Sequence, residues 1–152
     1  MPTEPVIIRP ATRADLPELG GLLAELFSLE PDFTIDAAAQ RRGLALLLDE
    51  PRARLLAAEC EGRVVGMCSG QLVISTSEGG PAILVEDVVV AKTCRGRGIG
   101  AALLAELRNW ALARGAARLQ LLADRTNTPA LDFYRRLGWE TTQLICLRKR
   151  EA

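Results

Sequence analysis

Apolar residues recur along the first third of the chain at the three- and four-residue spacing that is typical of amphipathic helices. Leucines at this spacing predict one helix over residues 16–27 and a second over 36–49. Thr12, followed three positions later by Asp15, resembles a capping box and places the start of the first helix here. A short apolar segment at 6–9 comes before them and predicts a strand.

After the second helix the pattern changes to short segments rich in β-branched residues, which favour strands. The segments 54–60 and 63–73 flank Glu61-Gly62, a two-residue hairpin signal, and a third apolar run covers 82–91. The remaining pattern predicts, in chain order, a helix that ends at Arg114, a strand over 118–124, a helix from Asn127 to Gly138, and a final strand or hairpin arm over 141–149.

This order of elements predicts one α/β domain over residues 1–152, a sandwich of helices around a mixed sheet. The chain of 152 residues has the size of one ordinary domain. The sequence contains no internal repeat, low-complexity segment or composition shift that would indicate a linker.

Net charge and cysteine usage narrow the possible partners and the compartment. The formal net charge is zero, which argues against a general surface for nucleic acid or anionic membranes. No apolar run has the length needed to span a bilayer. The four cysteines form no CxxC pair and follow no signal peptide, so we expect free thiols in a reducing cytoplasm.

The sequence contains no histidine. This absence removes Ser-His-Asp and Cys-His catalysis as well as histidine metal ligands. A general acid or base must therefore be Asp, Glu, Tyr, Lys or Cys, and we expect no metal.

Residues 83–101 read ILVEDVVVAKTCRGRGIGA, an apolar strand followed by a glycine-rich loop and the start of a helix. The N–H groups in the first turn of a helix have no intrahelical partner, and the helix dipole favours an anion there. Glycines allow the backbone to approach a ligand without an intervening Cβ. The segment is therefore predicted to bind a phosphate group.

Three kinds of phosphate loop are possible. A Walker A loop ends in GK[ST], which Gly98-Ile99-Gly100 lacks. A dinucleotide-binding loop needs GxGxxG, whereas this chain has GxGxG, although Asp124 could act as the ribose-binding acid. The loop also lies two-thirds along a short chain, which leaves no room for a second βαβ half.

The third kind fits more of the sequence. Arg95-x-x-Gly98-x-Gly100, after a strand that ends in three valines, resembles the pyrophosphate loop of the GNAT superfamily of N-acetyltransferases, whose cofactor is acetyl-CoA. Asn127-x-x-Ala130-x-x-Phe133-Tyr134-x-x-x-Gly138-Trp139 resembles the last helix of that superfamily. Together the two motifs cover Ile83–Trp139 and are most similar to the diamine N-acetyltransferases and their bacterial relatives.

The resemblance implies a three-layer fold with a mixed, mostly antiparallel sheet that is splayed between the strands at 82–91 and 118–124. The pantetheine arm of CoA would pair with the first of these strands, and the glycine loop would hold the pyrophosphate. The residues expected to contact the cofactor are Val88, Val89, Val90, Arg95, Gly96, Arg97, Gly98, Ile99, Gly100, Ala101, Asn127, Ala130 and Tyr134.

Two residues are candidates for proton transfer. Tyr134 stands where a tyrosine of the superfamily protonates the CoA thiolate, although its helical spacing also fits a buried core tyrosine. Glu86 aligns with the base proposed for the diamine acetyltransferases, and a structural salt bridge is the alternative. Asp87 follows directly, and because successive side chains of a strand point to opposite faces, it is expected to be structural.

The acceptor is expected to be a small cationic amine that attacks acetyl-CoA directly in a ternary complex, with Glu30, Asp32 and Glu86 as substrate-binding acids. These acids could equally be helix caps and solvated surface. The alternatives are a protein or peptide amine as acceptor, or a non-catalytic CoA sensor or dinucleotide-binding module. Relatives of this kind are often homodimers, and the final strand could join two subunits.

Overall fold

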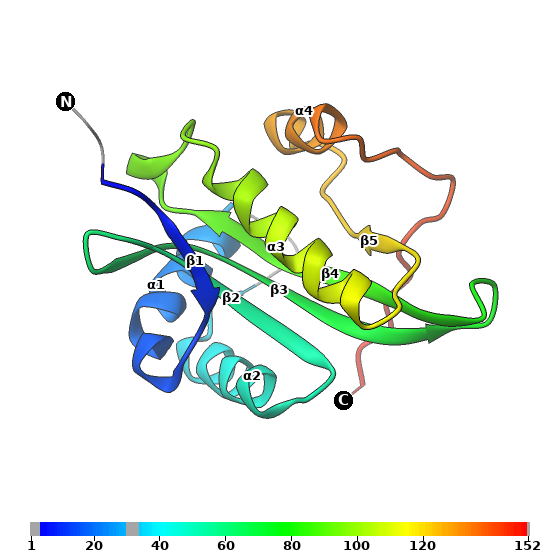
Figure 1. Ribbon diagram of the computed structural model, residues 1–152, viewed down its shortest axis with the longest axis horizontal. Helices are drawn as coiled ribbons and strands as arrows, with labels where there is room; N and C mark the ends of the chain where they lie inside the picture. The colour runs from blue at the N-terminus through cyan, green and yellow to red at the C-terminus, as the bar shows by residue number, and fades with distance from the viewer. Residues whose placement is uncertain (1–3, 30–33, 152) are drawn as a thin grey trace. The chain divides into compact units, whose positions relative to one another are not determined.

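The computed structural model describes residues 4–29 and 34–151 (Figure 1). Its elements, in chain order, are β1 (Ile7–Pro10), α1 (Leu16–Phe27), α2 (Ala37–Asp49), β2 (Ala53–Cys60), β3 (Arg63–Ser75), β4 (Gly80–Val90), α3 (Ile99–Ala113), β5 (Leu119–Leu121) and α4 (Thr128–Arg136). The chain falls into two compact units, Met1–Leu121 and Leu122–Ala152. The single domain expected over 1–152 therefore stays a prediction.

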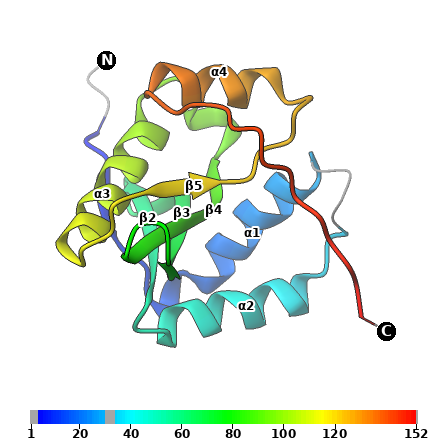
Figure 2. The same ribbon diagram turned by 90° about the vertical axis from the view of Figure 1, so that its right-hand side faces the viewer.

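The first unit is built on a five-stranded sheet in the order β1-β2-β3-β4-β5. Neighbouring strands are antiparallel except for β4 and β5, which are parallel. Helices α1 and α2 cover one face of the sheet and α3 covers the other (Figures 1 and 2). The predicted mixed, mostly antiparallel sheet with helices on both faces is confirmed.

Apolar side chains fill both faces of this sheet. Leu19 of α1 and Leu44 of α2 pack with Met67 of β3 on one face, and all three are almost fully buried. On the α3 side, Leu103 and Leu107 have no exposed surface. Burial of a leucine side chain stabilises a fold by about 1.5–3 kcal/mol, so these helices are fixed mainly by their apolar stripes.

The hairpin predicted at Glu61-Gly62 is confirmed. Glu61 has φ 53° and Gly62 has φ 74°, as a two-residue turn between twisted antiparallel strands requires. This turn sets the register in which β2 and β3 pair from Cys60–Arg63 onward. The strand that later carries the site, β4, pairs with β3 in turn.

The ladder between β4 and β5 is short. It runs only from Ile83–Leu119 to Val85–Leu121, so the strand predicted over 118–124 has three residues. The second half of β4 lies outside this ladder. The predicted splay of the sheet at this place is thus present in the pairing pattern.

In the second unit, α4 begins and ends as the sequence predicts. The Asn127 side-chain oxygen accepts a hydrogen bond from the Ala130 N–H at 3.3 Å, which caps the helix. Gly138, with φ 92°, follows its end.

The strand predicted over 141–149 is wrong. These residues form no strand, and Leu144, Ile145 and Leu147 are 85%, 69% and 87% exposed. A strand is stable only when a neighbouring strand satisfies its N–H and C=O groups, and none pairs with this segment in the described chain. The alternating pattern of side chains over 141–149 favours a strand, but it does not provide a neighbouring strand for pairing.

Candidate functional site

The glycine-rich loop after β4 has the predicted form. Gly96 and Gly98 have φ 77° and 78°, in the left-handed region, and Gly98 is the N-cap of α3. The first α-helical bond of α3 runs from the Ala102 N–H to the Gly98 oxygen. The N–H groups of Ile99, Gly100 and Ala101 therefore precede the helical ladder and are suited to an anion.

Arg95 is held by neighbouring groups in the first unit. Its Nε donates to the Val90 oxygen at 3.1 Å, and its Nη2 donates to Glu25 Oε1 at 3.3 Å. The same Glu25 oxygen accepts the Lys92 N–H at 3.1 Å. Glu25, on α1, thus ties the loop to the helix layer. No sequence signal marks this role, because the two partners are about seventy positions apart.

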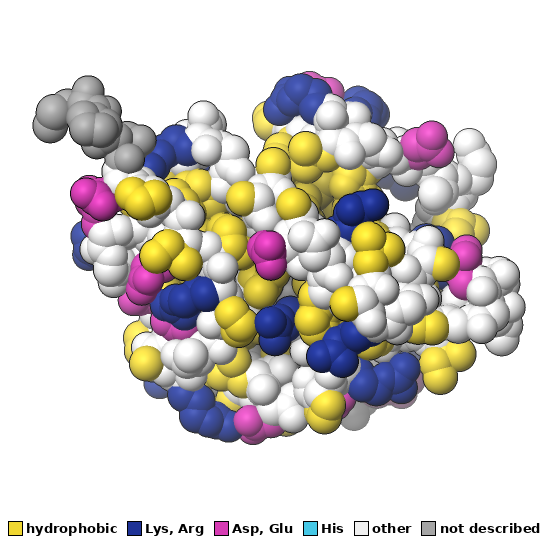
Figure 3. Space-filling model, viewed as in Figure 1, with side chains coloured by type: hydrophobic (Ala, Val, Ile, Leu, Met, Phe, Trp, Pro, Cys, Tyr) yellow, Lys and Arg dark blue, Asp and Glu magenta, His cyan; other side chains and the backbone are white. Residues whose placement is uncertain are grey.

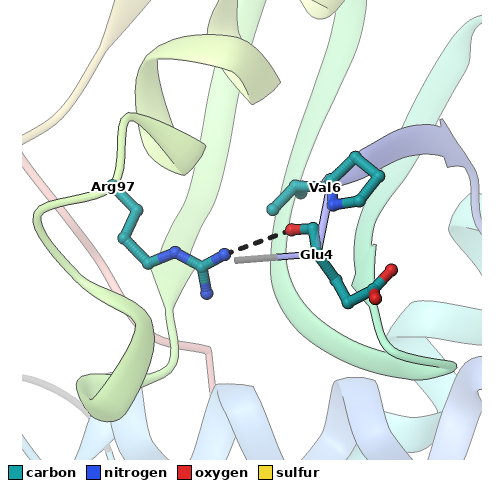
Figure 4. Close-up of a pocket in the computed structure, with 4 residues that line it drawn as sticks. Glu4, Val6 and Arg97 are labelled. Atoms are coloured by element: carbon teal, nitrogen blue, oxygen red, sulfur yellow. Dashed lines mark hydrogen bonds between the residues drawn. The ribbon is translucent and has the colours of Figure 1, made fainter. Parts of the chain in front are cut away.

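Arg97 turns toward the N-terminal segment (Figure 4). Its Nη2 donates to the Glu4 oxygen at 3.4 Å and lies 3.8 Å from Cys60 Sγ. It lines a hollow of about 470 Å³ together with Glu4, Pro5 and Val6. The contact of Arg97 with phosphate stays a prediction, and the main-chain N–H groups are the part of the loop that is already suited to it.

A β-bulge interrupts β4 at the acidic pair. Met67 of β3 faces Val89 and Ser69 faces Glu86, so one residue of β3 is opposite two residues of β4. Asp87 has φ 56°, which is uncommon for a residue other than glycine. The Ser69 hydroxyl donates to the Glu86 main-chain oxygen at 3.1 Å and stabilises the bulge.

The bulge brings both carboxylates of the pair to one place. Glu86 and Asp87 line the same hollow, so the expectation that they lie on opposite faces of the strand is wrong. The two-residue alternation that supported it holds only for a regular strand.

This second hollow, which we call the acceptor hollow, has a volume of about 460 Å³ and lies in the first unit. Its lining comes from both helices on one face of the sheet and from two strands. The lining residues are Leu23, Phe27, Gln40, Gly43, Leu44, Leu46, Leu47, Glu50, Gln71, Glu86 and Asp87. The lining carries three carboxylates and no basic side chain, and the rest of it is mostly apolar.

The two carboxylates of the bulge differ in environment. Glu86 is exposed and Asp87 is half-buried. Burial and, to a lesser extent, the charge of Glu86 raise the pKa of Asp87 to about 6, against the opposing effect of a hydrogen bond with Ser69. Asp87 can therefore take up a proton near pH 6, and the two carboxylates together can hold a cation.

Gln40 of α2 was not predicted as a site residue. Its amide nitrogen and oxygen are both buried, and neither has a hydrogen-bond partner in the described structure. Glu50 and Gln71 were missed as well. No local signal marks these residues, because the hollow forms only when α1 and α2 pack on the sheet.

Glu30 and Asp32 lie outside the described residues. Asp36 caps α2, where its Oδ1 accepts the Ala39 N–H at 3.0 Å. Asp124, the acid considered for ribose binding, accepts hydrogen bonds from the Thr126 N–H and hydroxyl at 2.8 and 2.7 Å.

Tyr134 lies on α4 in the second unit and is half-buried. Its ring makes edge contacts with Phe133 and Trp139, at centroid distances of 5.2 and 5.7 Å. These aromatic contacts fix the orientation of the ring within its unit. A half-buried phenol differs from the fully buried core tyrosine that the helical spacing also allowed.

The described residues contain no group of three or more Cys, Asp or Glu that could hold a metal ion. Within residues 4–29 and 34–151, every helix is too short or too polar to cross a membrane. Basic and acidic side chains are scattered over the face shown in Figure 3, which carries no patch of a single sign.

Residues 22–139 match the model of the Acetyltransferase (GNAT) family. Over 74 residues, the chain is 36% identical to a streptothricin acetyltransferase of Streptomyces lavendulae. That alignment covers 49% of this chain and 39% of the relative, so the chain corresponds to well under half of the relative's length.

Solved structures share the fold at lower identity. A transcriptional regulator from Bacillus halodurans C-125 has a TM-score of 0.84 and 24% identity, covering 97% of this chain and 100% of that one. The aminoglycoside N-acetyltransferase AAC(6′)-Iy in complex with CoA has a TM-score of 0.84 and 18% identity, covering 99% and 98%. One fold thus occurs in proteins with different descriptions, and function has to be argued from the site.

Proposed function

The chain belongs to the acetyltransferase (GNAT) family, and on this basis we propose that it transfers the acetyl group of acetyl-CoA to a primary amine. The observation that carries the proposal is the position of β4. This strand supplies Glu86 and Asp87 to the acceptor hollow and leads directly into the glycine loop at Arg95–Ala101. One strand thereby connects a place for an amine with a place for a phosphate.

The proposed cofactor site follows the family pattern. The N–H groups of the loop and of the first turn of α3 would bind the CoA pyrophosphate, with each charge-assisted hydrogen bond contributing about 1.5–3 kcal/mol. The pantetheine arm would lie along Val88–Val90, outside the β4–β5 ladder. The contacts of Asn127, Ala130 and Tyr134 with the cofactor stay predictions.

The proposed chemistry starts with removal of a proton. An alkylamine has a pKa near ~10.4, so only about one molecule in a thousand is neutral at pH 7.4. Glu86 takes this proton, directly or through water, and Asp87 holds the ammonium group beside it. The neutral amine would attack the thioester carbonyl in a ternary complex, with an N–H near Val88 positioned to polarise that carbonyl. Tyr134 would give its proton to the thiolate as the C–S bond breaks, and the proton that the new amide nitrogen loses would restore the phenol.

A small cationic amine is the proposed acceptor. The three carboxylates in a lining without a basic residue support it. The likeness to a streptothricin acetyltransferase and to an aminoglycoside acetyltransferase also supports a small-molecule amine. A protein amine and a CoA sensor are the competing functions. The diamine acetyltransferase-like branch, a bacterial origin, a homodimer and a cytoplasmic location stay predictions.

The test is release of free CoA thiol with a panel of small amines, using acetyl-CoA and longer acyl-CoAs. We expect turnover with acetyl-CoA and cationic amines, and no turnover when an N-acetylated form of the same amine is supplied. Binding of CoA without turnover on any amine would favour a sensor. Calorimetry that detects NAD but not CoA would overturn the cofactor assignment.

A further inference from the structure

Gln40 lines the acceptor hollow, and the proposed chemistry does not use its side-chain amide. We propose that this amide recognises a second group of the acceptor, a neutral hydroxyl or carboxamide that both donates and accepts hydrogen bonds. The substrate is then a hydroxyl- or amide-bearing amine rather than a plain polyamine. This inference rests on the proposed function, because it concerns the same hollow.

In the protein alone, the side-chain amide of Gln40 makes no hydrogen bond with the described residues. Its Nε2 and Oε1 are both buried, and neither has a hydrogen-bond partner in the described structure. Nine in ten or more buried polar groups in proteins are hydrogen-bonded, because a buried group without a partner loses its hydration and gains nothing. Both amide atoms are covered in the protein alone, so this residue of the lining would gain the missing partners when its side chain turns toward a ligand in the hollow.

A group that bonds both atoms of this amide must accept one hydrogen bond and donate another. A primary amide donates through its nitrogen and accepts through its oxygen. An ammonium group could pair only with the oxygen. A carboxylate could pair only with the nitrogen, and it would be repelled by Glu50, Glu86 and Asp87 in the same lining. A neutral hydroxyl or carboxamide satisfies both atoms without this repulsion.

Most of the other residues that line the acceptor hollow are apolar. Five of the lining residues are large and apolar, namely Leu23, Phe27, Leu44, Leu46 and Leu47. This surface fits a carbon skeleton. The predicted acceptor therefore has an amine for the carboxylates of β4, a hydrocarbon part for the leucines and a neutral hydrogen-bonding group for Gln40.

Two matched pairs of amines test this prediction. They are 1,3-diaminopropane with 1,3-diamino-2-propanol, and cadaverine with lysinamide, in which a carboxamide is added to the same chain. We expect the member with the neutral polar group to have a kcat/KM about tenfold higher in at least one pair, because a site built to bond a substrate group discriminates against its loss.

The variant Gln40→Met keeps the length of the side chain and removes both polar atoms. It should abolish the preference by raising KM for the substituted amine, with less than a twofold change for the plain diamine. Its Tm should equal or exceed that of the unchanged protein, which shows that it folds. Gln120→Met makes the same change at an exposed position of β5 that does not line the hollow, and should keep the preference.

The results separate the two proposals. Equal kcat/KM values within both pairs, or a preference that survives Gln40→Met, would overturn the role of Gln40 and leave acetyl transfer intact. Failure to acetylate any amine in either pair would count against the proposed function and this inference together.

Discussion

The glycine loop at 95–101 and the acceptor hollow both belong to the first unit but are constructed in opposite ways. The loop is one continuous stretch whose ligand-binding groups are main-chain N–H groups. The hollow combines side chains from α1, α2, β3 and β4. Under the proposed function, local backbone geometry holds a cofactor shared by a whole family, whereas side chains that tertiary packing brings together would select the acceptor.

The two regions also differ in how their polar groups are satisfied. In the loop, Arg95 has an ionic partner in Glu25 and an acceptor in Val90. In the hollow, the amide of Gln40 lacks partners and Asp87 has a raised pKa. The loop therefore has the geometry of a preformed site. In the hollow, burial of polar groups without partners lowers stability, and under the proposed function a bound substrate would supply those partners.

The largest expected effect on the rate comes from a substitution at Tyr134, which belongs neither to the glycine loop nor to the acceptor hollow. Tyr134→Phe removes the proposed acid and should lower kcat by about 10²–10⁴-fold, which corresponds to roughly 3–5 kcal/mol of barrier. Binding of CoA and KM for the amine should stay within twofold. Stopped-flow or steady-state assays measure the rates, and calorimetry measures the binding. An unchanged kcat would remove Tyr134 from the mechanism. Phe133→Leu, beside it on α4, is the control for repacking.

Substitution of the acidic pair tests the hollow. Glu86→Gln should lower kcat by about 10²–10³-fold, because it removes the proposed base. Asp87→Asn should mainly raise KM for the amine, since Asn tolerates the positive φ of the bulge as well as Asp does. If Asp87→Asn lowers kcat by this factor and Glu86→Gln does not, Asp87 is the base and the assignment of Glu86 is wrong.

The same Asp87 variant should gain stability. In the folded protein the pKa of Asp87 is raised from 3.8 to about 6, so the native state holds the proton more tightly than the unfolded chain. Stability therefore falls as pH rises from about 4 to about 6 and stays lower above that range. Asp87→Asn removes this loss, on the order of 3 kcal/mol at pH 7.5 and near zero at pH 4. Urea unfolding at both pH values measures it.

Gly98→Ala tests the loop with a smaller effect. A Cβ at this position would meet no atom within 4 Å, so the cost arises from the positive φ and not from a clash. We expect about 1 kcal/mol of lost stability and a three- to tenfold rise in KM for acetyl-CoA. Gly62→Ala is the matched control, with φ 74° and equally open space in the β2–β3 turn. It should lose similar stability without any change in KM.

The smallest effect is expected for the link between α1 and the loop. Glu25→Gln keeps an acceptor for the Lys92 N–H but removes the charge opposite Arg95. Exposed ion pairs contribute about 0–1 kcal/mol, so KM for acetyl-CoA should rise two- to fourfold with kcat unchanged. Glu18→Gln, on the same helix but bonded to the Val64 N–H, should leave KM unaltered. A fall in KM for Glu25→Gln would mean that Glu25 withholds Arg95 from the cofactor.

The comparison of the two regions also explains which sequence predictions succeeded. The hairpin at Glu61-Gly62, the cap at Asn127 and the glycine loop depend on residues within a few positions of each other. Such local rules can be applied to a sequence alone. The strand predicted over 141–149 failed because pairing needs a partner that lies elsewhere in the chain or outside it.

The acidic pair shows where local rules stop. The sequence identified Glu86 and Asp87 as unusual in an apolar strand, but it placed them on opposite faces. The β-bulge opposite Met67 and Ser69 brings both side chains to the same hollow. No residue type in β4 predicts this bulge from the sequence. Gln40 had no signal at all, since its importance comes from burial without a partner.

The sequence by itself determined the order of the elements up to α4, the family and the form of the glycine loop. These depend on periodicity, caps and glycines that act over a few residues. Only the tertiary structure decided which side chains line the acceptor hollow, because α2 and β4 both contribute to this lining. These elements are held by packing of apolar surfaces, which many different sequences could provide. Burial, and with it the raised pKa of Asp87 and the unpaired amide of Gln40, exists only after that packing.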